Sequence, residues 1–500
     1  METPSSSFVV LFDQAVGSNP PVHYLCSLET GEQALLARIA LIRDAKRAIY
    51  LQTFIWTNDE SGRLIAYELL QAAKRGVKVR IIIDSWVSIG DPGLMAFLNT
   101  AHPNISVKHY NVAADQLHPS ALELVLEIVS NFQEFNHRMH NKSFIVDEAV
   151  CIVGGRNYGN AYFDRGRTRN FRDREAMLVG PIAQQVTKSF FDFWNSPYSC
   201  SGLDLKDVQQ WVERSPLSAD SSFDDFQTGG LFESVLTQAD DPTKVQDRFI
   251  GEMLPVTEVE FFSDSPGEAR QNKLSHKNRT VSEVGQLWKS ANDTILLQTP
   301  YFVLDGVHYG VLESLRSERP KLRVIVSTNS LASSDNLFTY AFAYRERNRY
   351  FEQLRLELHE YKPYPPVMHE VMEYRRPDSV DAPRCDNLEA CMSFDSAKHR
   401  HLCLHAKTFV IDDKAVWIGS INLDPRSAYV NSENGLLIFD KAFTSQIRDK
   451  IERDIRPENS WTVGISKRGR FTELLRKLFS LLTPSMGKVE KNLAEFTENF

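Results

Sequence analysis

A chain of 500 residues is longer than one hydrophobic core usually supports, so we expect two domains or two fused halves. Hydrophobic residues make up 42% and charged residues 24%, which excludes large-scale disorder. The formal net charge of −8 disfavours a protein whose main role is to coat nucleic acid, because that role usually requires a basic surplus.

The N-terminal region does not predict a membrane-targeting segment. Its only apolar run, residues 8–12, is too short for a signal peptide and lacks a basic flank. No stretch of the sequence approaches the ~20 apolar residues needed to cross a bilayer. Six cysteines without a C-x-x-C pair are more typical of a reducing compartment than of a disulfide scaffold. We therefore expect a cytoplasmic protein, or a peripheral one on the cytoplasmic side of the cell membrane.

An internal repeat dominates the organisation of the chain. Residues 48–84 read as strand, helix and strand, and residues 294–329 repeat this pattern with the same Leu-Gln-Thr at Gln52 and Gln298. Such a unit predicts parallel strands, and apolar runs such as 81–83 predict a sheet covered on both faces. The sequence therefore predicts a duplicated α/β fold.

A second element follows each copy of this unit. His140 begins the octad HNKSFIVD, and His405 begins the similar octad HAKTFVID. The segment between the strand–helix–strand unit and the octad is longer in the second copy than in the first, so the Pro-rich segment 361–384 is predicted to be an insertion. Two matched octads are much stronger evidence than one, since a lone H-x-K usually lies on a solvated strand edge.

The residue types in the octads point to phosphodiester chemistry. Residues two apart on a strand face the same side, so His140 projects with Lys142 and His405 projects with Lys407. One neutral histidine can attack phosphorus while the other, protonated, protonates the leaving oxygen, and the lysines stabilise the charge. This scheme requires no metal or other cofactor.

Further candidate site residues follow each octad. Asn157 and Asn422 come after Gly-Gly and Gly-Ser and can donate hydrogen bonds to a phosphate. Asp173 and Glu433 are candidates to fix the histidine tautomers. The octads end in two predicted structural turn residues, which are Asp147 and Asp412.

These motifs resemble the phospholipase D superfamily, whose signature is the doubled H-x-K-x-x-x-x-D, over residues 33–440. The segments 52–64, 138–157 and 419–433 are most similar to bacterial C-type cardiolipin synthases. The resemblance implies two fused, pseudo-symmetric αβα-sandwich halves with mixed, largely parallel sheets and a shared active site at their interface. Expected domains are an N-terminal half (1–200), a linker or insertion (201–247), a C-terminal half (248–460) and a tail (461–500).

The resemblance also implies a function. A phosphatidyl group is transferred to phosphatidylglycerol, with phosphatidylethanolamine as donor, through a phosphohistidine. His140 is the implied nucleophile and His405 the acid/base. Ser420, a further candidate for substrate binding, has Gly155 as its counterpart, so the halves are expected to bind phosphate unequally. Phospholipase D hydrolysis, a nuclease and a non-catalytic anionic-lipid-binding protein are the alternatives.

Three other segments allow two interpretations each. The five arginines of residues 165–174 form either a solvated face or a patch that attracts anionic headgroups. Cys385, Cys391, His399, His401 and Cys403 fit no familiar zinc spacing, so incidental loop residues are favoured over a metal site. Residues 466–483 form a basic amphipathic pattern, predicted to contact a membrane surface instead of docking on the core.

Overall fold

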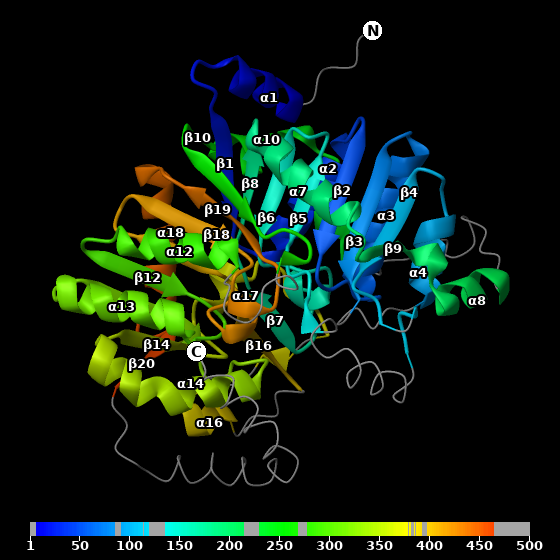
Figure 1. The fold of residues 1–500 in the computed structure, drawn as a ribbon. Coiled ribbons are helices and arrows are strands. Elements are labelled where there is room, and N and C mark those ends of the chain that lie inside the picture. The colour runs from blue at the N-terminus through cyan, green and yellow to red at the C-terminus, as the bar shows by residue number, and fades with distance from the viewer. Residues whose placement is uncertain are drawn as a thin grey trace.

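The computed structural model describes residues 7–85, 92–113, 115–119, 136–214, 230–268, 278–378, 380–381, 385, 387–392 and 398–464. The predicted membrane-contacting segment 466–483 lies outside these residues. Figure 1 shows two sheets in the middle of the molecule, with the first half in blue and cyan and the second in green and orange.

The first half contains a mixed sheet. Its nine strands within the described residues run in the order β10 (Leu254–Val256), β1 (His23–Leu28), β8 (Glu175–Val179), β6 (Val150–Gly154), β5 (Ser143–Val146), β2 (Ala48–Thr53), β3 (Lys78–Asp84), β4 (Ile105–Tyr110) and β9 (Ser199–Ser201). Strands β2, β3 and β4 pair in parallel, and the other neighbours pair antiparallel.

The second half repeats this arrangement. The eight strands in its described part run in the order β11 (Val259–Ser263), β19 (Asn434–Ile438), β18 (Ala415–Gly419), β17 (Thr408–Ile411), β12 (Thr294–Gln298), β13 (Arg323–Asn329), β14 (Glu357–Tyr361) and β20 (Ser460–Val463). Again the three strands β12, β13 and β14 are parallel, and the flanking strands are antiparallel.

The duplicated α/β fold predicted from the repeat is confirmed. The register is also repeated, because Gln52 pairs with Ser143 across β2 and β5, and Gln298 pairs with Thr408 across β12 and β17. Parallel pairing is confined to the βαβ strands, since the histidine octads fold as antiparallel hairpins beside them. The predominance of parallel strands expected for the sheets therefore applies only to this central part.

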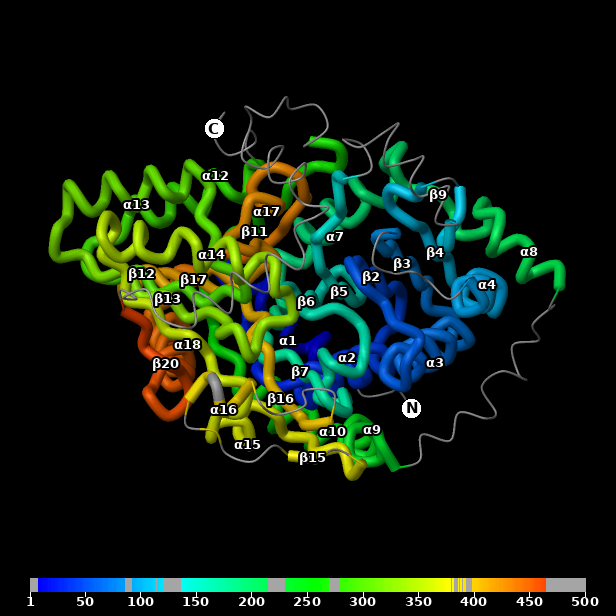
Figure 2. Tube along the Cα trace, turned by 90° about the horizontal axis from the view of Figure 1, so that it is seen from below, coloured from blue at the N-terminus to red at the C-terminus, as the bar shows by residue number. Residues whose placement is uncertain are grey.

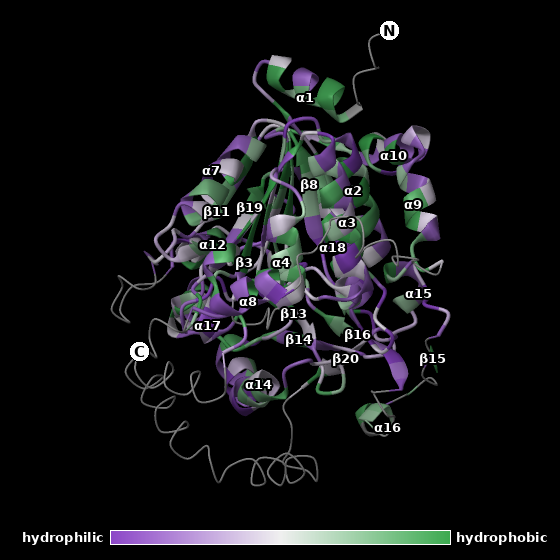
Figure 3. Cartoon of the chain, turned by 90° about the vertical axis from the view of Figure 1, so that its right-hand side faces the viewer, coloured by the Kyte–Doolittle hydropathy of each residue, from purple (hydrophilic) through white to green (hydrophobic). Residues whose placement is uncertain are grey.

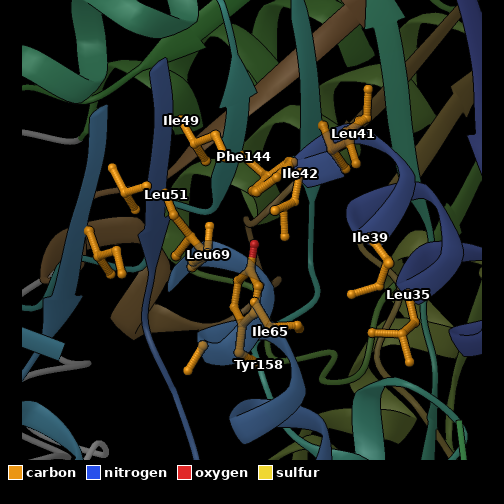
Figure 4. Close-up of a cluster of buried hydrophobic side chains, with 14 of the residues drawn as sticks. Leu35, Ile39, Leu41, Ile42, Ile49, Leu51, Ile65, Leu69, Phe144 and Tyr158 are labelled. Atoms are coloured by element: carbon orange, nitrogen blue, oxygen red, sulfur yellow. The ribbon is translucent and has the colours of Figure 1, made fainter. Parts of the chain in front are cut away.

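Helices cover both faces of each sheet, which gives the αβα layering. The outer face of the first sheet is covered by α2 (Gly31–Asp44), α3 (Glu60–Lys74), α4 (Pro92–Thr100) and α8 (Lys206–Arg214), and that of the second by α12 (Arg279–Lys289) and α13 (Gly306–Glu318). In Figure 4, apolar side chains of α2 and α3 surround Leu51 and Phe144 of the first sheet. Figure 3 shows the hydrophobic strands enclosed between helices of mixed character.

Two helices pack between the sheets, α7 (Ile182–Trp194) and α18 (Lys441–Asp454). Their buried side chains share one core cluster with strands of both halves, including Leu178 of β8 and Ile418 of β18. Figure 2, a view from below, shows the halves lying against one another along this contact. The halves are therefore fused through a continuous hydrophobic core.

The remaining described elements connect or cap the halves. They are α1 (Ser7–Gly17), α9 (Glu233–Ala239), α10 (Pro242–Arg248), α14 (Leu337–Arg349), α15 (Met368–Val371), α16 (Leu388–Met392) and α17 (Pro425–Tyr429). Helices α8, α9 and α10 fall almost entirely within the segment 201–247 that was predicted to be a linker or insertion, and β10 then joins the first sheet. A third sheet joins β15 (Val380–Asp381), β16 (His399–Leu404) and β7 (Arg169–Arg172).

Candidate active site

The two histidines are positioned by backbone pairing between the halves. Strand β16, which leads into His405, pairs in parallel with β7 of the first half. The backbone N–H of His405 donates to the carbonyl of Arg172 at 2.8 Å, and the N–H of His140 donates to that of Ser432 at 2.9 Å. This pairing holds His405 beside Asp173, which follows Arg172, and it holds His140 beside Glu433, which follows Ser432.

This pairing joins each histidine to the carboxylate of the opposite half. Nδ1 of His140 lies 2.8 Å from Oε2 of Glu433, and Nδ1 of His405 lies 2.5 Å from Oδ2 of Asp173. Asp173 and Glu433 were predicted to fix the tautomers from their positions within each half. The structure assigns them crosswise, so each half completes the other's histidine–carboxylate pair.

The lysines of the two octads lie at the same site. Lys142 and Lys407 are 2% and 1% exposed, and each Nζ donates to the carbonyl of its own octad histidine at 2.6 Å. Burial lowers the pKa of Lys142 to about 7 and that of Lys407 to about 8, although nearby carboxylates oppose the change. Two desolvated cations at one site suit a substrate with a charged phosphate.

The two histidine–carboxylate pairs differ electrostatically. Burial raises the pKa of Glu433 to about 7, whereas for Asp173 the charge of His405 and its hydrogen bond overcome burial and lower the pKa to about 2. Burial and both lysines hold the pKa of His140 well below its ordinary value. Burial and Lys407 also lower the pKa of His405, but Asp173 opposes them. The surroundings therefore favour the neutral imidazole more strongly at His140 than at His405.

Gly155 and Ser420 occupy equivalent positions of the repeat and contact the two carboxylates differently. A Cβ at Gly155 would lie 2.6 Å from Oδ1 of Asp173, so no larger residue fits there. The hydroxyl of Ser420 instead donates to Glu433 at 2.5 Å. This hydrogen bond engages Ser420 within the protein, and its predicted contact with substrate stays a prediction.

The two asparagines are placed differently. The amide of Asn157 accepts from the backbone N–H of Ile55 at 3.0 Å and donates to the hydroxyl of Tyr162 at 3.0 Å. Oδ1 of Asn422 is buried and has no hydrogen-bond partner among the described residues. Asn422 is therefore better placed than Asn157 to bind a ligand, although both roles stay predictions.

The two octad aspartates lie at the far ends of the hairpins. Asp147 accepts hydrogen bonds from the backbone N–H groups of residues 46, 47 and 48, and Asp412 accepts from those of 292, 293 and 294. Both adopt a positive φ, 54° and 49°, which a short polar side chain tolerates. They tie each hairpin turn to the start of the neighbouring strand, as their predicted structural role requires.

Sequence analysis missed two residues that support the histidines. Oδ2 of Asp84 accepts from the N–H of Met139 at 2.8 Å, and Oδ1 of Asn329 accepts from that of Leu404 at 2.8 Å. Each is the last residue of the second strand of its βαβ unit, and each holds the residue before a histidine. The matched polar ends of these apolar strands were the signal that could have identified them.

Aromatic rings form the walls around the histidines. The ring of Phe54 contacts that of His140 edge-on at 5.0 Å, and Tyr162 contacts His405 edge-on at 5.5 Å. The hydroxyl of Tyr301 donates to Oδ1 of Asp335 at 2.8 Å, and the charge of Asp335 favours the protonated form of His405. The two ring contacts restrict the orientation of the imidazole planes.

The arginine-rich segment 165–174 is largely internal, so neither predicted interpretation holds for its buried members. Arg172 forms ion pairs with Glu29 at 2.8 Å and Asp454 at 3.3 Å, and Arg174 also pairs with Glu29. Since Asp454 belongs to the second half, the ion pairs of Arg172 join the two halves beside Asp173. Only Arg167 and Arg169 of the run are exposed.

The cysteine–histidine segment contains a covalent bond. Cys385 and Cys391 form a disulfide, which removes both thiols as metal ligands, so these two cysteines are not the incidental loop residues that the sequence favoured. Within the described ranges, no three His, Cys, Asp or Glu side chains are grouped so that they could hold a metal ion. In the same part of the chain, none of the helices is long and apolar enough to span a bilayer.

Comparisons with known proteins agree with this geometry. The family described as "Cardiolipin synthase, PLD-like domain" matches residues 39–194 and 284–455. Cardiolipin synthase C of Escherichia coli (strain K12) is 30% identical over 452 residues, which cover 89% of this chain and 87% of that protein. A cardiolipin synthase of Staphylococcus aureus (strain N315) is 24% identical over 89% of this chain and 69% of its own length.

Among solved structures, the phosphatidylserine synthase of Haemophilus influenzae Rd KW20 has a similar fold. The TM-score is 0.58 at 15% identity, and the match covers 97% of this chain and 99% of that one. At this level of identity the likeness bears on the fold alone.

Proposed function

Because the chain belongs to the cardiolipin synthase family with phospholipase D-like domains, we propose that it makes cardiolipin by transferring a phosphatidyl group to phosphatidylglycerol. Phosphatidylethanolamine is the proposed donor. The observation that carries the proposal is the pair of crosswise histidine–carboxylate contacts with two buried lysines at one site.

In the first half-reaction, Nε2 of His140 attacks the phosphorus of the donor. The bond from phosphorus to the ethanolamine oxygen breaks, and protonated His405 gives its Nε2 proton to that oxygen. Lys142 and Lys407 stabilise the charge on the non-bridging oxygens. Glu433, at Nδ1 of His140, stabilises the positive charge on the resulting phosphohistidine.

In the second half-reaction, a hydroxyl of the phosphatidylglycerol headgroup attacks the same phosphorus. His405 takes the hydroxyl proton, with Asp173 stabilising the imidazolium, and the nitrogen–phosphorus bond breaks. Its electron pair returns to Nε2 of His140, and cardiolipin leaves. His405 donates a proton in the first step and accepts one in the second, and neither step requires a metal ion.

The division of roles between the histidines is supported by their different surroundings. His140 has the more strongly lowered pKa, and a neutral imidazole is the nucleophilic form. His405 contacts the ionised Asp173, which favours a protonated ring. The predicted placement on the cytoplasmic side of the membrane stays a prediction.

The function is tested with the purified chain and labelled phosphatidylglycerol, with and without phosphatidylethanolamine. Labelled cardiolipin supports transfer, and its increase on addition of phosphatidylethanolamine identifies the donor. Phosphatidic acid as the main product would instead indicate phospholipase D hydrolysis. Cleavage of DNA with neither lipid product would indicate a nuclease.

The roles of the histidines need a separate experiment. A donor with a p-nitrophenol leaving group does not require an acid, so His405→Ala should still form the phosphohistidine but release it slowly. We expect a labelled covalent adduct in His405→Ala and none in His140→Ala. The reverse pattern would exchange the two roles.

A further inference from the structure

The first turn of α14 exposes two large apolar side chains. Leu337 is 55% exposed and Phe338 is 50% exposed, and they are adjacent in the sequence. Most large apolar side chains of the described residues are buried in the core clusters. Such a pair is a candidate for a contact with something apolar outside the chain where its position in the fold gives the contact a role.

This turn lies beside the candidate active site. It begins two residues after Asp335, which accepts a hydrogen bond from Tyr301 and whose charge favours the protonated forms of His405 and Lys407. The inner face of α14 closes a pocket at the carboxyl ends of the parallel strands β12 and β13. An object that contacts the outer face of this turn therefore lies next to the pocket and the second histidine.

Beyond Phe338, the outer face of α14 becomes basic. It continues at helical spacing with Phe342, Arg345 and Arg349, and the Arg345 guanidinium carbon lies 5.5 Å from the centroid of the Phe342 ring. The side chains of Arg345 and Arg349 are 60% and 52% exposed, with Glu346 beside both. An apolar end followed by arginines suits the boundary between acyl chains and anionic headgroups.

We propose that the first turn of α14, through Leu337 and Phe338, inserts into the surface of a phospholipid bilayer and docks the active site there. The inference rests on the proposed lipid chemistry, because a phosphatidyltransferase must reach headgroups that stay in a bilayer. Glu346 leaves only one positive charge in excess on this face of α14, so we expect the apolar contact to dominate. Vesicle binding should therefore persist at high salt.

The test compares the full chain with Leu337→Ser/Phe338→Ser in co-sedimentation with vesicles of phosphatidylethanolamine and phosphatidylglycerol. About half of each side chain is exposed, so removing both predicts a roughly tenfold to hundredfold loss of partitioning. Val9→Ser/Val10→Ser is the matched control, since these residues are 37% and 41% exposed on α1. Helices α1 and α14 lie at opposite ends of the molecule (Figures 1 and 3), and the control should bind within about twofold of the unchanged chain.

A second measurement shows that the site itself is intact. Turnover of a short-chain phospholipid below its micellar concentration should be the same in both variants within about twofold, because a dispersed substrate needs no docking. Equal vesicle binding by the α14 variant would overturn the proposal, and so would an equal loss of turnover on dispersed and vesicle lipid. A changed oligomeric state with unchanged vesicle binding would instead identify the turn as a self-association surface. If the proposed function is wrong, neither the unchanged chain nor the variants will turn over lipid, but the vesicle co-sedimentation still tests the docking proposal.

Discussion

Glu433 and Asp173 are equivalent residues of the repeat, yet they should respond oppositely to loss of their charge. Glu433 has a pKa of about 7, so the folded state binds its proton more tightly than the unfolded chain does. Its ionisation therefore costs stability as the pH rises from 4.5 through 7. Asp173 has a pKa of about 2, so its charge contributes stability above its ordinary pKa, which is lost as the pH falls through 2.

The magnitudes follow from these pKa values at about 1.4 kcal/mol per unit. At pH 8, Glu433→Gln should remove a cost of about 3 kcal/mol, and Asp173→Asn should remove a contribution of about 2 kcal/mol. The hydrogen bonds of Ser420 and Ser427 to Glu433 can be reoriented around an amide, because hydroxyls both donate and accept. We therefore expect Glu433→Gln to be stabilised at pH 8 and Asp173→Asn to be destabilised.

Activity should fall in both variants, because an amide NH₂ facing Nδ1 moves the imidazole proton to Nε2. In Glu433→Gln the attacking nitrogen of His140 becomes protonated, and a loss of about 10⁴-fold is expected by analogy with tautomer control in serine proteases. The assay follows denaturant unfolding midpoints from pH 5 to 9, alongside transfer rates. Equal destabilisation of the two variants at pH 8 would refute the assigned charge states, whereas full activity in either would refute tautomer control.

Three other predictions concern the lysines, the octad aspartates and metal ions. Transfer activity should fall as the pH rises through 7–8, where Lys142 and then Lys407 lose their charge. Because Lys142 has the lower pKa, Lys142→Arg should move this alkaline limb upward in a kcat/KM profile. Asp147→Ala should lower stability by about 1–3 kcal/mol through the loss of three hydrogen bonds to backbone N–H groups and a positive φ that alanine tolerates poorly. The rate per folded molecule should be retained, and a selective loss of rate would show a catalytic role. Dialysis against EDTA should leave the rate of cardiolipin formation unchanged, and restoration of lost activity by a divalent ion would contradict the paired-histidine scheme.

The repeat explains how much could be predicted from the sequence. Matching strands, helices and octads require the same local structure twice, so the two sheets and the clustering of His140, Lys142, His405 and Lys407 followed from pattern alone. The partners of Asp173 and Glu433 did not follow, because sequence spacing does not show which half supplies a neighbour. Asp84 was missed since a polar residue ending a buried strand is usually a turn residue.

The crosswise pairing makes the interface between the halves part of the catalytic chemistry. Neither histidine has its carboxylate until β7 meets β16 and Ser432 meets His140. A change at the interface can therefore reduce activity without touching a reacting atom. Arg172 shows this most directly, because its carbonyl accepts from the N–H of His405 while its guanidinium pairs with Asp454. Arg172→Met removes the guanidinium from the buried Asp454, whereas Glu29 keeps its ion pair with Arg174, and we expect a cost of about 3–5 kcal/mol. The change should misplace Asp173 relative to His405 more than Glu433 relative to His140. Formation of the phosphohistidine from a p-nitrophenyl donor should then survive better than its transfer to phosphatidylglycerol, and equal loss of both steps would show that the network only stabilises the fold.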